Sequence, residues 1–217
     1  AAAALGGLIG LVALSALAFP LFGALGSLAV IAVAAVLGLL APHPVGLWRA
    51  GGVIFLGLVV IAVLGMRGTT PDGFLAGIFL GFVVWPTDTG AFFTGRQIGG
   101  ERLAPDISPS KTWSGAIGGL ALGTLGGLIV WLIVAPQSPW WIGLILAAAM
   151  SILGQMGDLA ESAIKRRFRI KDSGDIIPGH GGLMDRLDSL TFAVLLLFVV
   201  GWTRGGIDGV AAGFLNW

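Results

Sequence analysis

Residues 114–135 read SGAIGGLALGTLGGLIVWLIVA, a run that contains no charged side chain. A helix needs about 20 consecutive apolar residues to cross the hydrocarbon core of a bilayer. Within this run Gly115, Gly119, Gly123 and Gly127 recur every four residues. That spacing places them on one helix face, where the missing side chains let another backbone approach closely. The stretch therefore predicts a membrane-spanning helix with one tightly packed face.

Six further segments have the length and apolar character of a membrane span. Short turns that carry Pro or Gly separate most of them. Together with residues 114–135 they predict an all-α, polytopic membrane helix bundle with about seven transmembrane helices. The six segments are Ala2–Phe19, Leu21–Ala41, Ala50–Met66, Gly73–Phe93, Trp140–Ala163 and Leu187–Trp202.

The composition agrees with a lipid environment. Hydrophobic residues make up 56% of the 217 residues and charged residues only 11%, whereas soluble domains carry about 25% charged residues. The chain has no cysteine, which excludes disulfides and thiolate metal sites. We expect one integral-membrane domain over residues 1–217, with N-terminal helices in 1–72 and catalytic helices and loops in 73–203. Because the chain begins inside an apolar stretch, we also expect its N-terminus to be truncated.

The basic residues predict an orientation. If the helices alternate and the polar segments Arg96–Trp113 and Lys165–Met184 are cytoplasmic, only Arg67 and Arg204 lie on the outer side. This ten-to-two distribution is a strong positive-inside signal. It places the two polar segments, and any active site that they form, on the cytoplasmic face of a membrane, which we expect to be the bacterial inner membrane. The ten inner residues are Arg49, Arg96, Arg102, Lys111, Lys165, Arg166, Arg167, Arg169, Lys171 and Arg186.

A second glycine series accompanies the first. Gly73, Gly77 and Gly81 are also spaced by four residues in the segment Gly73–Phe93. We expect the two glycine-bearing helices to pack on each other or on a second subunit, which would give a homodimer. The alternative is that glycine is simply common in membrane helices.

Acidic residues gather at the ends of the last two predicted spans. Asp158 and Glu161 are three residues apart and share a helix face, and Asp185 and Asp188 repeat this spacing. Carboxylates at membrane depth are costly without a partner. Hard oxygen ligands suit Mg²⁺, which shares its coordination shell with substrate phosphates. The alternative is that these acids pair with neighbouring Lys and Arg residues.

Five of the seven residues from Lys165 to Lys171 are cationic. Such a cluster can neutralise phosphate groups, or it can anchor the chain to anionic lipid. His180 follows in the sequence Pro178-Gly179-His180-Gly181-Gly182, a loop whose backbone N–H groups can approach a phosphate.

Two upstream features belong to the same prediction. Asp88 is an ionisable group within a predicted span, which makes it a functional candidate. Ser108, Lys111 and Thr112 precede the helix of residues 114–135, where hydroxyl groups and a lysine can meet phosphate at a helix N-terminus. The alternative for this segment is a simple capping turn.

At these residues the chain resembles the phosphatidate cytidylyltransferase (CDP-diacylglycerol synthase) family. The upstream segments 88–92 and 108–112 are also similar, and the resemblance runs from about Gly73 to Trp202. Thr87, Phe92 and Ser114 stand where many members have Asn, Tyr and Glu. The C-terminal signature is matched by Ser162, Lys165-Arg166, Lys171-Asp172, His180-Gly181-Gly182, Asp185-Arg186 and Asp188.

The resemblance implies a Mg²⁺-dependent transfer of CMP from CTP to phosphatidate, which yields CDP-diacylglycerol and pyrophosphate. Besides CTP, phosphatidate and the bilayer, no nucleic acid is implied, and the number of cations, including a second one, stays open. The implied metal ligands are Asp158 and Asp185, with Asp188 and Glu161 as further candidates. The implied catalytic and substrate-binding residues also include Lys165, His180, Arg186, Asp88, Ser108, Lys111, Thr112, Ser162, Arg166, Lys171, Gly181 and Gly182.

Two alternatives remain open. One is a CTP-dependent polyprenol or phytol kinase, and the other is a membrane transporter. A CDP-alcohol phosphatidyltransferase is excluded because Asp185 and Asp188 are three residues apart, where that class has a spacing of four.

Overall fold

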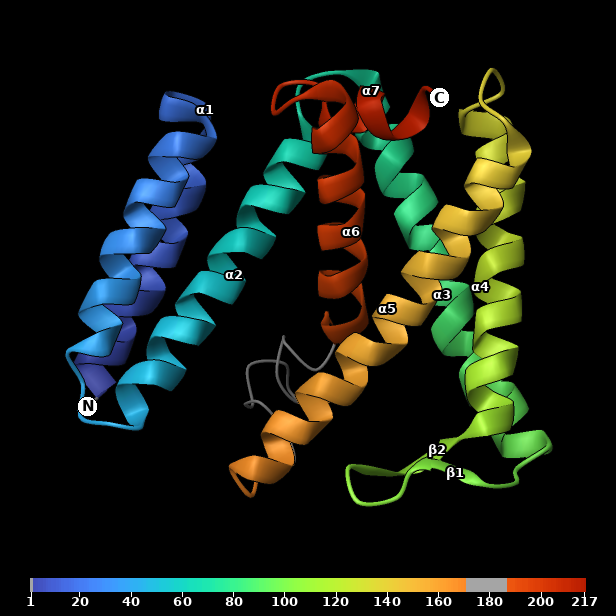
Figure 1. Cartoon of the computed structure of the whole chain (residues 1–217), viewed down its shortest axis with the longest axis horizontal. Coiled ribbons are helices and arrows are strands. Elements are labelled where there is room, and N and C mark those ends of the chain that lie inside the picture. Colours follow the sequence, from blue (N-terminus) through green and yellow to red (C-terminus); the bar gives the residue numbers. More distant parts are fainter. Residues whose placement is uncertain (1, 171–186) are drawn as a thin grey trace.

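A computed structural model describes residues 2–170 and 187–217, and nearly all of its regular structure is helical (Figure 1). One two-stranded antiparallel hairpin interrupts the helices. The elements are α1 (Ala2–Leu39), α2 (Val45–Arg67), α3 (Pro71–Gln97), β1 (Arg102–Ala104), β2 (Ser108–Thr112), α4 (Trp113–Val134), α5 (Trp140–Arg167), α6 (Asp188–Gly205) and α7 (Val210–Leu215).

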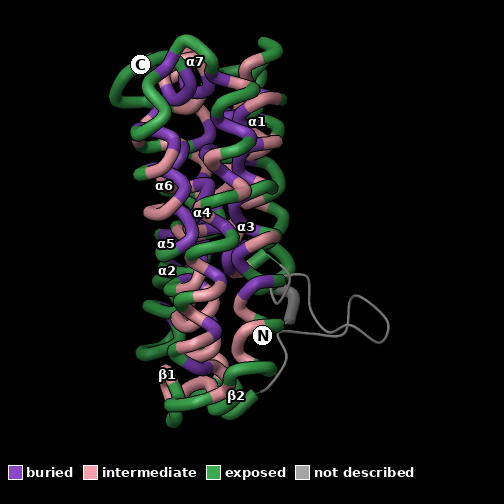
Figure 2. The backbone as a smooth tube through the Cα atoms, turned by 90° about the vertical axis from the view of Figure 1, so that its right-hand side faces the viewer, coloured by how far each residue is buried: buried purple, intermediate pink, exposed green. Residues whose placement is uncertain are grey.

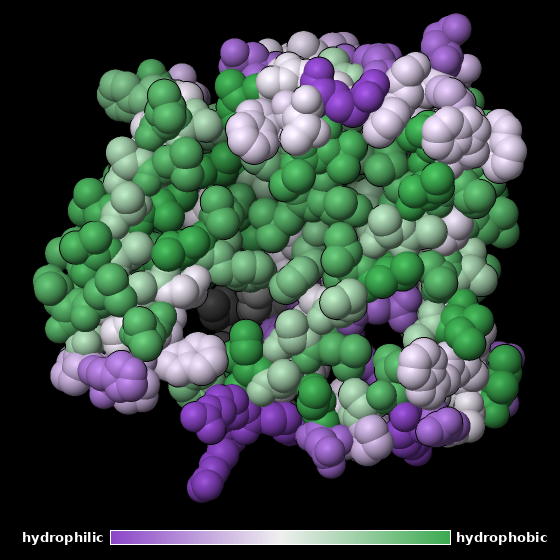
Figure 3. All heavy atoms as spheres, in the orientation of Figure 1, coloured by the Kyte–Doolittle hydropathy of each residue, from purple (hydrophilic) through white to green (hydrophobic). Residues whose placement is uncertain are grey.

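The predicted fold class is confirmed. Within the described residues, the six helices α1 to α6 are long and apolar enough to cross a membrane. They lie side by side, and their apolar side chains cover the middle of the face seen in Figure 3, with hydrophilic side chains along its two ends. Figure 2 shows buried positions inside the bundle and exposed positions on its outer turns and in the hairpin. The chain is therefore a polytopic membrane helix bundle.

The first two predicted spans form one element, α1, that reverses its direction at Gly23. The backbone of Gly23 has φ 66° and ψ −167°, a conformation that is essentially restricted to glycine. The hydroxyl of Ser27 donates a hydrogen bond of 2.7 Å to the carbonyl oxygen of Ser15. In a straight helix these residues would be about 18 Å apart. The predicted boundary at Pro20 is therefore wrong by three residues, and the two arms of α1 together with α2–α6 make seven passes.

This reversal predicts the effect of Gly23→Ala. An added Cβ meets no atom within 4 Å, so only the strained backbone opposes the substitution. We expect a loss of about 1–3 kcal/mol of stability, measured as a lower melting temperature in detergent. Gly10→Ala is the matched control, because its added Cβ also meets nothing and alanine favours a helix. Equal melting temperatures for the two variants would contradict the assignment of strain to Gly23.

The glycine face of α4 packs against α3. A Cβ added at Gly119 would lie 2.7 Å from the carbonyl oxygen of Thr87, and one added at Gly123 would lie 2.9 Å from that of Val83. Gly115 and Gly127 contact α3 in the same way. The prediction that α4 packs closely on α3 is confirmed. The α3 side of this contact is built by Val83, Thr87 and Ala91 rather than by the predicted glycines, since an added Cβ at Gly77 meets nothing within 4 Å.

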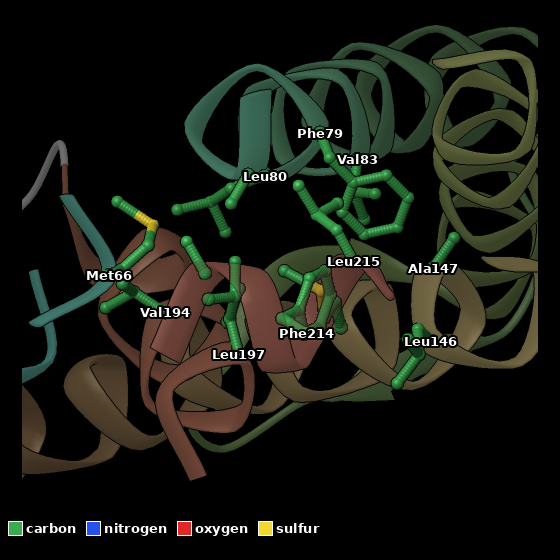
Figure 4. Packing of buried hydrophobic residues seen from close by; sticks show 14 of the residues in the cluster. Met66, Phe79, Leu80, Val83, Leu146, Ala147, Val194, Leu197, Phe214 and Leu215 are labelled. Carbon is green, nitrogen blue, oxygen red and sulfur yellow. The ribbon is translucent and has the colours of Figure 1, made fainter. Parts of the chain in front are cut away.

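A buried apolar core lies where the helices α2 to α6 and the C-terminal helix α7 meet (Figure 4). The ring of Phe79 contacts those of Trp131 and Phe214, with centroid distances of 5.5 Å in both pairs. The C-terminal segment is held there by Ser138, whose hydroxyl donates to the carbonyl oxygen of Leu215 at 2.5 Å and accepts from the N–H of Trp217 at 2.9 Å. This packing fixes the end of the bundle opposite the hairpin.

The other end of the bundle carries the polar features. The C-terminal ends of α3 and α5, the N-terminal ends of α4 and α6, and the hairpin β1–β2 all lie toward this end (Figure 1). The pairing of Arg102 with Thr112 and of Ala104 with Ser108 holds the hairpin together. A hydrogen bond of 3.2 Å from Arg166 Nε to the carbonyl oxygen of Ile107 attaches it to α5. The predicted polar loop 96–113 is thus a folded structure.

Candidate active site

A pocket of about 800 Å³ opens at this polar end, between α3, α4, α5 and the hairpin. Its wall combines acidic and basic side chains with apolar ones and with small residues of the α4 N-terminus. Such mixed, concave sites are where ligands usually bind. The lining residues are Asp88, Ala91, Phe92, Gly95, Arg96, Arg102, Leu103, Pro109, Ser110, Lys111, Thr112, Gly115, Ala116, Gln155 and Asp158.

Lys111 and Asp158 form an ion pair across the pocket. Lys111 Nζ lies 2.5 Å from Asp158 Oδ2. Lys111 stands on β2 next to the start of α4, whereas Asp158 projects from α5, so the pair brings together two separate predicted segments. The two side chains keep 25% and 34% of their surface exposed. A pair that remains this accessible adds little stability, but it leaves both groups available to a ligand.

Asp88 is held by α6. The Ser189 hydroxyl donates a hydrogen bond of 3.2 Å to Asp88 Oδ2. The neighbouring Asp188 accepts a 2.7 Å hydrogen bond from the Ser189 N–H, at the N-terminus of α6, where a negative charge is favourable. The side chains of α3 and α6 therefore meet although 101 residues separate Asp88 from Ser189.

Four of the described acids, Asp88, Asp158, Glu161 and Asp188, form one electrostatic neighbourhood. Asp88, Asp158 and Asp188 are near enough to interact with one another, and Lys111 acts on both Asp88 and Asp188. Asp188 is also near enough to Glu161 for the two carboxyl groups to interact. Lys165 Nζ lies 3.5 Å from Glu161 Oε1, one helical turn along α5. Negative charge is thus concentrated beside the pocket and is balanced in part by lysines.

These acids do not by themselves make a metal cage. Among residues 2–170 and 187–217, no group of three or more His, Asp or Glu side chains is arranged to hold an ion. Mg²⁺ does not require such a cage, since it usually binds one or two carboxylates and completes its shell with water and substrate phosphates. The carboxylates are hard oxygen donors at the wall of an open pocket, so the donor set fits this ion.

Two predicted residues near the pocket have structural contacts. The side chain of Thr112 accepts a hydrogen bond of 3.1 Å from the N–H of Gly115 and caps α4, so the capping interpretation is correct for this hydroxyl, which also lines the pocket. Arg166 holds the hairpin through Ile107. Ser108 in β2 and Ser162 in α5 are half-buried and do not belong to the pocket wall as described.

The other predicted site residues cannot be placed in the same way. Lys171, His180, Gly181, Gly182, Asp185 and Arg186 lie outside the described residues. Their roles therefore remain predictions from the sequence.

The structure adds site residues that the sequence interpretation missed. Gln155 lines the pocket and donates from Nε2 to the Ala116 carbonyl oxygen at 3.3 Å. It precedes Asp158 by three positions, and this spacing on one helix face was the signal that could have identified it. Arg96 and Arg102 also line the pocket, although the sequence had suggested only a role in orientation for them.

Two positions that depart from the family pattern have packing contacts. Thr87 is buried and donates to either Val83 O or Ser151 Oγ, both at 2.8 Å, which joins α3 to α5. The hydroxyl of Ser114 donates to the carbonyl oxygen of Gly99. These side chains hold the helices around the pocket, while Phe92 forms part of its wall.

Fold and pocket together define a polytopic membrane protein whose carboxylates and cations meet at one end of a helix bundle. Comparison with known families gives a more specific result. The profile described as the cytidylyltransferase family matches residues 2–203, and the chain belongs to this family.

Three curated relatives share one name. A phosphatidate cytidylyltransferase of Brucella abortus biovar 1 (strain 9-941) is 46% identical over 169 residues, which are 78% of this chain and 62% of that protein. The protein of the same name from Staphylococcus saprophyticus is 42% identical over 142 residues, covering 65% of this chain and 55% of the relative. The protein of the same name from Bacillus subtilis (strain 168) is 37% identical over 145 residues, covering 67% of this chain and 54% of the relative. The chain thus spans little more than half of the length of these relatives.

Proposed function

We propose that this protein is a phosphatidate cytidylyltransferase, which transfers CMP from CTP to phosphatidate and releases pyrophosphate. Family membership and the shared name of the relatives support the proposal. The observation that carries it is the pocket in which Asp88, Lys111 and Asp158 face one another. This pocket opens at the polar end of an apolar bundle, where a water-soluble nucleotide and a lipid headgroup can meet.

In the proposed reaction, a phosphate oxygen of phosphatidate attacks the α-phosphorus of CTP. The new phosphorus–oxygen bond forms as the bond to the β-phosphate breaks, and pyrophosphate leaves. Because the attacking phosphate is already anionic, no protein nucleophile is required. The main tasks of the protein are to align the two substrates and to neutralise their charge.

The positions of the described cations support that neutralisation. Lys111, Arg96 and Arg102 line the pocket, and Lys165 stands on α5 one turn beyond Glu161. We assign phosphate binding to Lys111, and support of the acidic cluster to Lys165. Arg166 keeps the hairpin that carries Lys111 attached to α5. From the sequence we add Lys171, His180 and Arg186 as phosphate-neutralising groups.

We further propose Mg²⁺ as the cofactor, with Asp158 and Asp185 as ligands and Asp188 and Glu161 as supporting carboxylates. When bound, this ion would supply positive charge to the triphosphate. Asp158 lies in the pocket wall. Among residues 2–170 and 187–217 its ion-pair partner is the partly exposed Lys111, which supports its assignment as a ligand.

We also propose that the pocket faces the cytoplasm of a bacterial cell. The ten-to-two distribution of basic residues supports this orientation, and the relatives are bacterial. The chemistry is assigned to residues 73–203 of a single membrane domain. A homodimer remains a prediction from the glycine series in the sequence.

The direct test is an assay of the purified protein with radiolabelled CTP, phosphatidate and Mg²⁺. We expect a labelled lipid product, its loss after chelation with EDTA, and its return when Mg²⁺ is added in excess. A control with diacylglycerol or a polyprenol in place of phosphatidate should give no labelled lipid. Full activity after chelation would contradict the metal assignment, and phosphorylation of an alcohol would favour the kinase alternative.

A further inference from the structure

A second cavity, of about 770 Å³, lies between the first arm of α1, the start of α2 and the end of α5. We call it the α1–α2–α5 groove. Its lining is mostly apolar, and the rings of Trp48 and Phe168 contact each other at a centroid distance of 5.0 Å. The lining residues are Leu5, Leu8, Ile9, Val12, Pro44, Val45, Trp48, Arg49, Gly51, Gly52, Val53, Phe55, Leu56, Ile164, Arg167 and Phe168.

The groove is open toward the surface of the bundle that lipid would cover. Several of its large apolar side chains are exposed, with Ile9 at 61% and Trp48 at 45%. α1, α2 and α5 are all long and apolar enough to span a bilayer. Hydrocarbon chains are the apolar material available at such a surface, so lipid tails can enter the groove from the side.

Two arginines stand in this apolar wall. Arg49 follows Trp48 in α2, and Arg167 precedes Phe168 at the end of α5. Within the described ranges, ion pairs join only Lys111 to Asp158 and Lys165 to Glu161, so neither arginine has an acidic partner there. Guanidinium groups bind phosphate in a bidentate manner. Charge and shape together fit a lipid with a phosphate headgroup.

The groove is separate from the pocket at Asp158. Ile164, Arg167 and Phe168 follow a spacing of three and four and share one face of α5. Asp158 is nine positions before Arg167, which corresponds to about half a turn of rotation and to about 13 Å along the axis. α5 therefore stands between the two cavities, and a lipid held at Arg167 is beside the reaction pocket but not in it.

We propose that the α1–α2–α5 groove is a loading site for the anionic lipid substrate. It takes up the acyl chains laterally from the bilayer and holds the headgroup phosphate between Arg49 and Arg167 before the headgroup enters the pocket. This proposal rests on the proposed function, because it identifies the lipid as phosphatidate. It assigns to residues 1–72 a share in substrate capture.

Two pairs of variants test the groove. The double variant Arg49→Gln/Arg167→Gln removes the charge, with Arg169→Gln as the control, since Arg169 is at the same helix end but outside the groove. Gly52→Phe fills the groove, because an added Cβ there meets nothing within 4 Å. Gly77→Phe is its control, with an equally open Cβ position on α3.

The first readout is lipid binding to the detergent-purified protein, measured by native mass spectrometry with dioleoyl phosphatidate or dioleoyl phosphatidylcholine. We expect wild type to bind phosphatidate more strongly than phosphatidylcholine. In the double arginine variant the ratio of the two affinities should be about tenfold lower. Gly52→Phe should bind both lipids more weakly, and both controls should match wild type. Inorganic phosphate at the same concentration should not displace the lipid, because the tails contribute to binding.

The second readout is steady-state kinetics in mixed micelles. The double variant should raise the KM for phosphatidate about tenfold and leave the KM for CTP within twofold. An unchanged lipid preference and an unchanged phosphatidate KM in the double variant would overturn the proposal, as would displacement of the lipid by inorganic phosphate. If Gly52→Phe fails to fold, the charge variants decide alone. If wild type makes no product, but the double arginine variant loses the preference for phosphatidate that wild type shows, the proposed reaction fails while the anionic-lipid groove stands.

Discussion

Asp158→Asn should lower CMP transfer at least about a hundredfold, the size of effect seen when one electrostatic stabiliser of a transition state is removed. The amide keeps the shape of the carboxylate but loses its charge, so it is a poor ligand for Mg²⁺. The substitution also removes the ionic partner of Lys111. Initial rates with saturating CTP and phosphatidate measure the effect, and a titration with Mg²⁺ shows whether higher ion concentrations restore activity.

Asp72→Asn is the matched control for this experiment. Asp72 lies in the first turn of α3, at the end of the bundle away from the hairpin. The Asp72→Asn variant carries the same chemical change and should keep wild-type turnover. Both variants should remain folded, because the Lys111–Asp158 pair is partly exposed and contributes little stability. An active Asp158→Asn protein would remove the metal-ligand assignment.

The second large effect is expected on stability. Gly119→Leu should destabilise the folded protein by more than about 3 kcal/mol, above the usual range for overpacked cores. Its Cβ alone would lie 2.7 Å from the carbonyl oxygen of Thr87 and 3.0 Å from the Cβ of Ala91. A backbone carbonyl cannot move aside without a shift of α3 as a whole. The variant should show a clearly lower melting temperature or fail to accumulate in the membrane.

Gly77→Leu provides the comparison. It introduces the same side chain within the long helix α3, but its Cβ position is open and leucine favours helix formation. We expect wild-type stability or a small gain. A similar loss in both leucine variants would mean that glycine content, rather than the α3–α4 contact, governs the stability of the bundle.

Much of the fold could be predicted because hydrocarbon imposes a simple length rule on each helix. The packing of α4 was also predicted correctly, because glycines spaced by four residues lie on one helix face and let α3 approach closely. The α3 glycines were not informative, because the face that meets α4 is set by Val83, Thr87 and Ala91. The reversal in α1 was placed at Pro20, although a residue with positive φ was required there, and Gly23 supplies it.

The site was only partly predictable. Charge at membrane depth singled out Asp88 and Asp158, because an ionised group needs a reason to be there. Ser189 gave no such signal, since its contact with Asp88 depends on how α6 packs against α3. The hairpin β1–β2 was also missed, because its strands are short and partly exposed and lack the alternating pattern that identifies a strand. Tertiary contacts, rather than local sequence, decide both features.

The ion pair between Lys111 and Asp158 has a consequence for the resting protein. An ammonium group already occupies the place where an inorganic cation would neutralise Asp158, so the unliganded pocket carries its own counterion. In the proposed reaction, nucleotide binding would then be an exchange, in which Lys111 leaves one anion for another and little net charge would have to be desolvated.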